Sequence, residues 1–293
     1  MIKYKPLLNF MLKRHEIYLS RAAGKSPPWT RDPILQKYSF TNVYRELDRV
    51  TVWVRKSIRE PYAEHPNLWF MLCFARQINW PPMLEELIRV GGWPLADRWR
   101  WQDTMRTMRA RAARGEKVYT GAYILNAQGE NRPEIAGHGR FDKPLFTSRL
   151  VLQSVWEARK KVEPAMSTTL QTATETLKQY FGWGGFTAYE VICDLRHTRY
   201  LRDATDKLTW AHAGPGALRG LFRLTGYLPA PRLAVQQMRA LLEEMSPRWI
   251  PQPVLELREI EHSLCEFDKY ERVRLGEGRP KALFKPQDEG RLP

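Results

Sequence analysis

Apolar residues recur at helical spacing along most of this chain of 293 residues. One apolar stripe runs over residues 43–58, and residues 68–75 are apolar on every side, as in a buried central helix. Pro81 and Pro82 end that helix and can start the next one. The spacing predicts further helices over residues 99–114, 150–161, 170–181, 188–195, 207–224, 235–245 and 254–264. Because the alternation typical of strands is limited to residues 117–125, we predict an almost entirely α-helical fold.

A glycine-rich octapeptide, residues 181–188, lies between two of these predicted helices. Its glycines permit a tight turn, and Thr187 can cap the second helix, whose N–H groups and positive dipole end would then face an anion. We interpret residues 170–196 as a helix-hairpin-helix motif that grips a DNA backbone. A plain αα-hairpin with a glycine C-cap explains the octapeptide equally well. The DNA-binding candidates are Gly182, Trp183, Gly184, Gly185, Phe186 and Thr187.

The charge of the chain favours a polyanionic partner. Its 47 Lys and Arg residues against 32 Asp and Glu residues give a formal charge of +15, and its pI is about 9.8. Such an excess favours phosphate contacts and counterion release. The positive residues are spread along the chain rather than gathered on one amphipathic helix, which argues against a membrane-surface binder.

The sequence lacks the motifs that mark several kinds of site. Cys73, Cys193 and Cys265 lie too far apart to form a zinc or iron–sulfur cluster motif. The segment 24–26 imitates the end of a phosphate-binding loop, but Leu19 stands where the required earlier glycine would be. We therefore expect no self-contained kinase or ATPase. No signal peptide and no bilayer-spanning apolar run is recognisable, so we expect no membrane partner and a location in a reducing cytoplasm.

The predicted organisation is one large helical domain with two basic ends. Residues 40–279 are expected to form a DNA-modifying domain that contains the helix-hairpin-helix motif at about residues 170–196. Residues 1–39 form a basic N-terminal extension and residues 280–293 a basic tail, and both are expected to be irregular because they carry prolines and many charges. The segment 126–144 is expected to be a long loop.

Polar residues gather at the start of the stripe that begins near Phe40. If a helix starts there, Asn42, Arg45, Asp48 and Arg49 lie about a turn apart on the side away from the core. A solvated charged face is the ordinary explanation of such a pattern.

Three sequence blocks together suggest a family. They are residues 40–51, the hairpin followed by residues 210–220, and residues 261–270. In combination they resemble the helical DNA-modifying proteins of bacteriophages called α-glutamyl/putrescinyl-thymine pyrophosphorylases, or amino acid:DNA transferases, which share their helical domain with the 5-hydroxymethyluracil DNA kinases. The resemblance covers about residues 40–279. We therefore predict an all-α, DNA-glycosylase-like helical fold with a helix-hairpin-helix motif.

The resemblance implies a specific reaction. In such phages 5-hydroxymethyluracil replaces thymine, a kinase activates its hydroxymethyl group as a pyrophosphate, and the transferase exchanges that pyrophosphate for the amine of an amino acid. Glycine is our first choice of amino acid, ahead of glutamate and serine. The implied partners are double-stranded DNA carrying the activated base, a free amino acid, a 5-hydroxymethyluracil DNA kinase and downstream modifying enzymes, all in the cytoplasm of the infected host bacterium.

The chemistry of this reaction indicates which residue types are needed. A base in a duplex has to be flipped into a pocket, and the departing pyrophosphate needs cationic groups. A carboxylate has to take a proton from the ammonium group, so that a neutral amine can attack the methylene carbon. A divalent metal ion that bridges the pyrophosphate and an acidic residue would be sensible, although the sequence contains no dedicated set of metal ligands.

We choose candidate site residues by the chemistry of their side chains and, for most of them, by their position in one of the three sequence blocks. The catalytic candidates are Asp48, Asp206 and Asp268, and the substrate-binding candidates are Asn42, Tyr44, Arg45, Arg49, His212, Arg219, Lys269 and Tyr270. Arg45 and Arg49 would hold pyrophosphate or the amino-acid carboxylate, with Asp48 as proton acceptor or as an orienting partner of the arginines. Asp206 follows the hairpin at about the distance of the catalytic aspartate in helix-hairpin-helix glycosylases, with Asp203 as a fallback. An N-cap of a helix that begins at Lys207 explains Asp206 as well.

Two other functions stay open. A monofunctional DNA glycosylase that uses Asp206 on a modified thymine would need the same hairpin, whereas a glycosylase with lyase activity is disfavoured because Phe186 stands where such enzymes carry a Schiff-base lysine. A non-catalytic DNA-binding partner of a 5-hydroxymethyluracil DNA kinase would also account for the charge and the hairpin.

Overall fold

The fold is built from helices, as predicted. A computed structural model of the protein describes residues 2–95, 97–120, 142–251, 253–280 and 282–285. Within these residues there is no β-strand, and the one antiparallel bridge joins Tyr38 and Leu283. The chain divides into two compact units, which we call the terminal unit (residues 1–51 and 205–291) and the central unit (residues 52–204).

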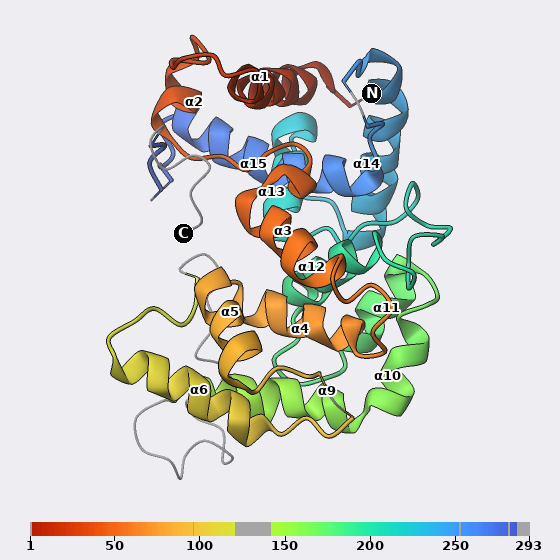
Figure 1. Ribbon diagram of the computed structural model, residues 1–293. Helices are drawn as coiled ribbons and strands as arrows, with labels where there is room; N and C mark the ends of the chain where they lie inside the picture. The colour runs from red at the N-terminus through yellow and green to blue at the C-terminus, as the bar shows by residue number, and fades with distance from the viewer. Residues whose placement is uncertain (1, 96, 121–141, 252, 281, 286–293) are drawn as a thin grey trace. The chain divides into compact units, whose positions relative to one another are not determined.

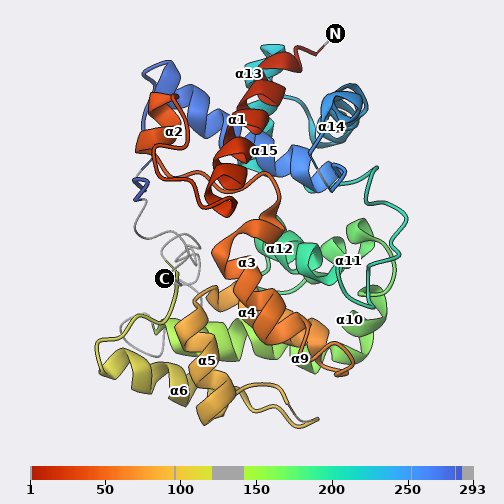
Figure 2. The same cartoon turned by 45° about the horizontal axis from the view of Figure 1, so that its top comes forward.

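The terminal unit is organised around its last helix, α15 (Leu257–Arg274). Helices α1 (Lys5–Ala22), α2 (Pro33–Lys37), α13 (Pro215–Thr225) and α14 (Pro231–Met245) all pack against α15 (Figures 1 and 2). Short 3-10 helices lie at Arg45–Leu47 and Ser246–Arg248. Phe10 of α1 contacts Phe267 of α15 with a ring separation of 5.9 Å, so the first and last long helices share one core.

Two glycines allow α13 to approach α15 very closely. A methyl group at Gly220 would lie within 3.0 Å of the carbonyl oxygen of Leu264, and one at Gly216 would lie within 3.0 Å of the Cys265 sulfur. The two glycines are one helical turn apart and therefore face the same neighbour. Helix α15 itself begins with a capping box, in which the side chains of Glu256 and Glu259 bind each other's backbone N–H groups.

The central unit surrounds the buried helix α4 (Leu68–Ile78), every residue of which is buried. Around it lie α5 (Pro81–Val90), α6 (Trp101–Ala113), α8 (Lys143–Leu145), α9 (Gln153–Glu157), α10 (Arg159–Ala165), α11 (Leu170–Leu177) and α12 (Gly185–Leu195), with π-helical turns at Arg55–Arg59 and Phe146–Leu152. Helix α3 (Arg49–Val54) joins the two units in sequence. A buried bidentate ion pair between Arg76 of α4 and Asp194 of α12, at 2.6 and 2.8 Å, fixes these two helices together.

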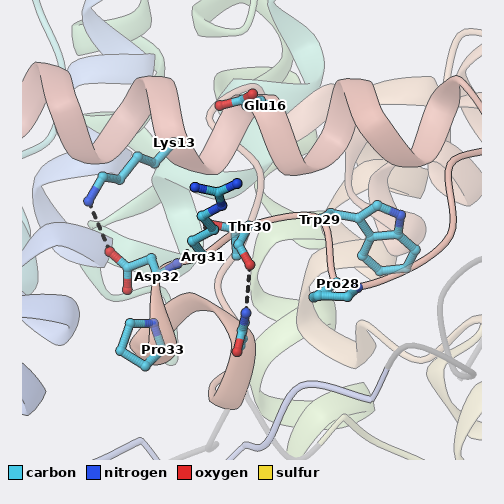
Figure 3. A pocket seen from close by; sticks show the side chains of 9 residues that line it. Lys13, Glu16, Pro28, Trp29, Thr30, Arg31, Asp32 and Pro33 are labelled. Carbon is cyan, nitrogen blue, oxygen red and sulfur yellow. Dashed lines mark hydrogen bonds and ion pairs between the residues drawn. The ribbon is translucent and has the colours of Figure 1, made fainter.

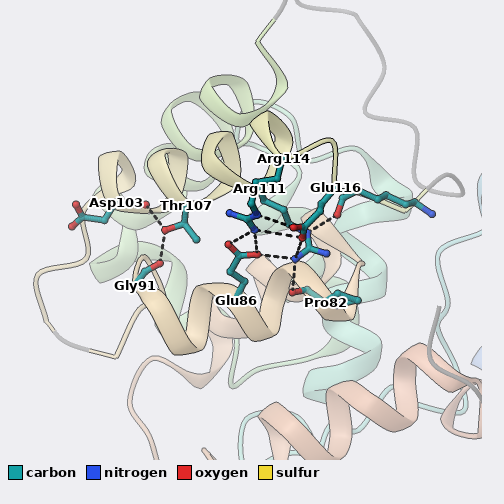
Figure 4. A network of polar contacts seen from close by, with 9 residues as sticks. Pro82, Glu86, Gly91, Asp103, Thr107, Arg111, Arg114 and Glu116 are labelled. Atoms are coloured by element: carbon teal, nitrogen blue, oxygen red, sulfur yellow. Dashed lines mark hydrogen bonds and ion pairs between the residues drawn. The ribbon is translucent and has the colours of Figure 1, made fainter.

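An ion-pair network joins α5 to the arginine-rich helix α6 (Figure 4). Glu86 accepts hydrogen bonds from Arg111 at 2.7 Å and from Arg114 at 2.8 and 2.9 Å. Burial would raise the pKa of the Glu86 carboxyl, but the hydrogen bonds from the two arginines outweigh it and lower this pKa. The two arginines thus hold α5 against α6, and their charge is largely compensated within the protein.

Three expectations about individual segments are wrong. The stripe that begins near Phe40 does not start an α-helix there, because side-chain hydrogen bonds of Asn42 and Asp48 hold residues 41–48 in a loop around the short 3-10 helix, and α3 begins only at Arg49. Residues 205–209 form turns, and α13 begins only at Pro215. The N-terminal forty residues contain the long helix α1, which buries Leu7, Phe10 and Met11 among other apolar residues in spite of its charge.

Other expectations concern segments that lie partly outside the described residues. Residues 117–120 form no strand, and the rest of the predicted alternating segment cannot be compared. Of the expected long loop, only residues 142–144 are described, and they begin α8. The domain boundaries near residues 39 and 279 stay predictions. None of the described helices is both long and apolar enough to cross a membrane.

Replacing Gly220 by alanine should destabilise the terminal unit. The new methyl group would clash with the backbone of α15 at Leu264, and such overpacking costs about 1–3 kcal/mol. Gly214→Ala is the matched control, because Gly214 has an ordinary φ of −72° and an added methyl group would meet nothing within 4 Å. Urea unfolding measures both variants. Equal loss of stability in the two would show that the close helix crossing is not a constraint.

Candidate functional site

The predicted residue Asp268 lies fully buried on α15 and is surrounded by arginines. Its carboxylate accepts hydrogen bonds from Nε of Arg219 at 2.8 Å and from Nε of Arg223 at 3.1 Å. Nε of Arg272 lies 3.4 Å from the same carboxylate. A buried carboxylate is stable only when it is paired, so Asp268 orients these three guanidinium groups.

The arginines differ in how far they are compensated. Arg223 is mostly buried and also donates to both carboxylate oxygens of Glu277, at 3.1 and 2.5 Å, which lowers the pKa of Glu277. The side chain of Arg219, by contrast, is 51% exposed, and among the described residues its two Nη groups have no partner. Arg219 therefore presents a planar pair of N–H donors to solvent, which is the geometry that binds phosphate oxygens.

The predicted residue Tyr270 joins α15 to the start of α2. Its hydroxyl donates to Asp32 at 2.8 Å, and Nζ of Lys13 on α1 lies 3.1 Å from the same carboxylate oxygen. The other oxygen of Asp32 caps α2 by accepting from the backbone of Ile34 at 3.0 Å. Burial opposes the charge of Asp32, but the hydrogen bonds from Tyr270 and Lys13 lower its pKa overall. Burial, with the neighbouring Asp32 carboxylate, raises the pKa of Tyr270.

Two hollows flank this Lys13–Asp32–Tyr270 group. The first, of about 760 Å³, lies between α1 and residues 28–36 (Figure 3). The second, of about 390 Å³, is lined by residues of α1 and α15 that include Arg223 and Tyr270. Lys13 lines both hollows. Lys13 thus links the larger hollow to Arg223, one of the three arginines around Asp268.

The predicted residue Lys269 belongs to a second polar group on α15. Its Nζ lies 2.6 Å from Glu266 and 4.6 Å from the centre of the Phe40 ring. Glu266 also accepts from the backbone N–H of Thr41 at 3.0 Å, and the Thr41 hydroxyl is hydrogen-bonded to His262. These contacts attach residues 40–41 to α15.

The predicted residues near Arg45 form a closed loop rather than one face of a helix. Asp48 accepts from the backbone N–H of Asn42 at 2.9 Å, from its side-chain amide at 2.8 Å and from Arg45. Of the two roles predicted for Asp48, this geometry fits the orienting partner of an arginine. Arg49 is exposed at the start of α3.

Tyr44 is a core residue of the terminal unit. Its buried hydroxyl accepts a hydrogen bond from Nε1 of Trp249 at 2.6 Å and donates to the carbonyl of Pro253. Burial raises the pKa of the Tyr44 hydroxyl. The contacts of Tyr44 are those of a residue that stabilises the fold.

Asp206 and His212 precede α13. Asp206 lies half-buried in a turn, where its carbonyl accepts from the backbone of Thr209 at 3.0 Å and of Trp210 at 2.8 Å. Because no helix begins at Lys207, the alternative explanation of Asp206 as an N-cap is wrong. His212 is half-buried, two residues before the Gly214 N-cap of α13.

The predicted hairpin joins α11 to α12 in the central unit. Trp183 is buried, with 2% of its surface exposed, and its Nε1 donates to the carbonyl of Val151 at 3.3 Å. Gly182 has a φ of +79° and packs so closely on Val151 that a side chain would clash. The predicted capping by Thr187 is wrong, because Gly184 is the N-cap and Thr187 is the third residue of α12.

The outward side of the hairpin is formed by Gly184, Gly185 and Phe186. The Phe186 side chain is 55% exposed, and Gly184 has room around it for a side chain. The first N–H groups of a helix have no acceptor within the helix, so this end of α12 is suited to an anion. DNA binding by the hairpin stays a prediction.

The structure adds residues that the sequence interpretation missed. Arg223 follows Arg219 by one helical turn and Arg272 follows Asp268 by one turn, so helical spacing could have found both. Asp32 and Lys13 were missed because the N-terminal residues were expected to be irregular. The described residues contain no group of three or more His, Cys, Asp or Glu side chains that could hold a metal ion.

Replacing Asp32 by asparagine should lower stability in a pH-dependent manner. The folded-state pKa of Asp32 lies below its ordinary value of about 3.9, so its charge stabilises the fold above that pH and the contribution is lost as the pH falls through the folded value. The asparagine side chain would still cap α2. Urea unfolding should show a less stable variant at pH 7 and a difference that shrinks as the pH falls below that ordinary value.

The control for this prediction is Asp203→Asn, since Asp203 is 90% exposed. Its stability should match that of the unmodified protein at pH 7 and at the lower pH. If Asp32→Asn lowers the free energy of unfolding equally at both pH values, the charge on Asp32 is not the cause of the lost stability.

Comparison with known proteins identifies the family. Residues 2–279 match the family model described as the helical domain of 5-hmdU DNA kinase. The chain is also 27% identical over 281 residues to a 5-hmdU DNA kinase of Bacillus phage SP10, and the match covers 89% of this chain but 43% of that relative. No solved structure matches. The chain therefore belongs to the family of the 5-hmdU DNA kinase helical domain.

Proposed function

We propose that the protein is a transferase of phage DNA hypermodification. It replaces the pyrophosphate on an activated 5-hydroxymethyluracil base in DNA by the amine of an amino acid. The family supports a role on 5-hydroxymethyluracil DNA. The lack of a phosphate-binding loop in the sequence argues against ATP-dependent phosphorylation by this chain alone. The observation that carries the proposal is the exposed Arg219 guanidinium, fixed by the buried carboxylate of Asp268.

The arginine group fits the leaving group of this reaction. The amine nitrogen forms a bond to the methylene carbon, the carbon–oxygen bond to pyrophosphate breaks, and the ammonium proton passes to a carboxylate or to solvent. Negative charge grows on the departing pyrophosphate, and preorganised cations stabilise such charge because they need no reorientation. Arg219 and Arg272 are held in place by Asp268 before any substrate binds.

The other predicted residues receive supporting roles in this proposal. Arg45, oriented by Asp48, and the exposed Arg49 would bind the DNA backbone or substrate phosphates. Asp206 and His212 would border the base, and Asp206 is a candidate for the proton acceptor. Lys269 and Tyr270 would hold α15 against Phe40 and Asp32 rather than contact the substrate.

DNA recognition in this proposal depends on backbone contacts. The chain carries an excess of 15 positive charges, which favours binding that depends little on base sequence. The hairpin between α11 and α12 would contact phosphates as a helix-hairpin-helix motif in a DNA-glycosylase-like fold. The target base would be flipped out of the duplex, a step that costs a few kcal/mol.

The family match also favours a second candidate function. The chain spans 43% of the length of the phage SP10 kinase, and its match is to a helical domain. A chain of this kind could bind modified DNA for a separate 5-hydroxymethyluracil DNA kinase without transferring an amino acid. A monofunctional glycosylase using Asp206 is the third possibility, because Asp206 is half-buried in a turn.

Analysis of nucleosides separates these functions. DNA that contains 5-hydroxymethyluracil is treated with a kinase, ATP, an amino acid and this protein, and its nucleosides are measured by mass spectrometry. The transferase predicts a new nucleoside with an amino acid on the methylene group. An unchanged pyrophosphorylated nucleoside with every amino acid would refute transfer, and abasic sites would indicate a glycosylase.

Arg219→Ala tests the role of the arginine group in the same assay. Loss of one group that stabilises transition-state charge lowers the turnover rate by about 10²–10³-fold, so we expect a loss of this size. Stability should also fall, because the buried Asp268 loses one of its partners, but Arg223 still pairs with this carboxylate and the variant should fold. Arg239→Ala on α14 is the control, since Arg239 is exposed and has no ion pair in the described structure. Equal rates in the two variants would remove Arg219 from the site.

A further inference from the structure

The larger hollow of the terminal unit carries opposite charges that do not pair with each other. Glu16 projects from α1 and Arg31 from the following loop, and both line the hollow of about 760 Å³ (Figure 3). Neither side chain has a hydrogen bond or ion pair within the described residues. Opposite charges in one hollow that do not pair can each bind the complementary end of a zwitterion.

We propose that this hollow binds the free amino acid, and this inference rests on the proposed function. Arg31 would hold the α-carboxylate through two parallel N–H donors. Glu16 would accept hydrogen bonds from the α-ammonium group. The hollow lies within the range of about 300–1,000 Å³ that small-molecule sites occupy.

The walls of the hollow are fixed by their own contacts. Lys13 lies 3.1 Å from Asp32, and the Trp29 ring nitrogen donates to the carbonyl of Lys25 at 2.6 Å. Gln36 donates to the carbonyl of Thr30 at 2.6 Å (Figure 3). With these polar groups engaged, Arg31 and Glu16 are the charged groups left for a ligand. The Trp29 ring offers an apolar wall to the side chain of the bound amino acid.

The location of the hollow agrees with the reaction. Lys13 lines both this hollow and the second hollow, which contains Arg223 of the Asp268 group. Arg219 and Arg272, which we assign to pyrophosphate, line neither hollow but share the Asp268 carboxylate with Arg223. Both substrates of the transfer would then be held by one unit.

Equilibrium dialysis of the full chain against a mixture of the twenty standard amino acids tests this site. We expect one or a few amino acids to be retained. Arg31→Gln and Glu16→Gln should each weaken the binding of a retained amino acid by about tenfold or more, as expected for a lost hydrogen bond to a charged group. The amide of that amino acid, which lacks the carboxylate, should bind at least as weakly to the unmodified protein.

The controls are Arg239→Gln and Glu243→Gln, two exposed residues of α14 without ion pairs in the described structure. Their binding should equal that of the unmodified protein. Failure to retain any amino acid, or equal retention by the Arg31 and Glu16 variants, would overturn the site.

Transfer kinetics separate this inference from the proposed function. A raised KM for the amino acid in Arg31→Gln, with unchanged DNA affinity, supports both. An unchanged KM in an active variant refutes the site and leaves the transferase function intact. Retention that depends on Arg31 and Glu16, without transfer of any amino acid to DNA, supports the site and refutes the function.

Discussion

The crossing of α13 over α15 is the constraint on which the rest of the terminal unit depends. Gly216 and Gly220 have no side chains, so the two helices approach closely enough for Arg219 and Arg223 to reach the buried carboxylate of Asp268. That carboxylate is stable only because guanidinium groups surround it. Close packing and the arrangement of charge therefore depend on each other. The exposed Arg219 is fixed in place as a consequence of core packing.

The polar residues of the terminal unit are of two kinds: some are engaged by neighbouring residues, and others keep donor groups for a ligand. Asp48 and Glu266 are occupied by neighbouring backbone and side chains, and these contacts hold the segment around Asn42 in its loop. Arg219 and Arg31 keep donor groups free for a ligand. The first set explains the fold, and the second set supports binding of an anion and of an amino acid. In the central unit, by contrast, the arginines of α6 are mostly compensated by carboxylates such as Glu86.

Periodicity was enough to predict the helical class and several helices, because residues such as those of α4 and α14 repeat with a clear apolar pattern. It was misleading at Asn42 and Asp48, where local side-chain hydrogen bonds replace a helix. The prolines and charges of the N-terminal residues were misleading in a different way, because these residues contain the helix α1. Sequence blocks pointed to Asp268 and Arg219. They could not show that these residues meet, since 49 positions separate them and only the packing of α13 on α15 joins them.

The central claim is that Asp268 holds arginines ready for a phosphate anion. Isothermal titration with inorganic pyrophosphate tests it directly on the unmodified protein and on a variant that combines Arg219→Ala with Arg272→Ala. The claim predicts binding by the unmodified protein and a loss of at least about a hundredfold in the variant, since each lost charged contact contributes about 1.5–3 kcal/mol. Equal pyrophosphate affinity in two folded proteins would contradict the claim.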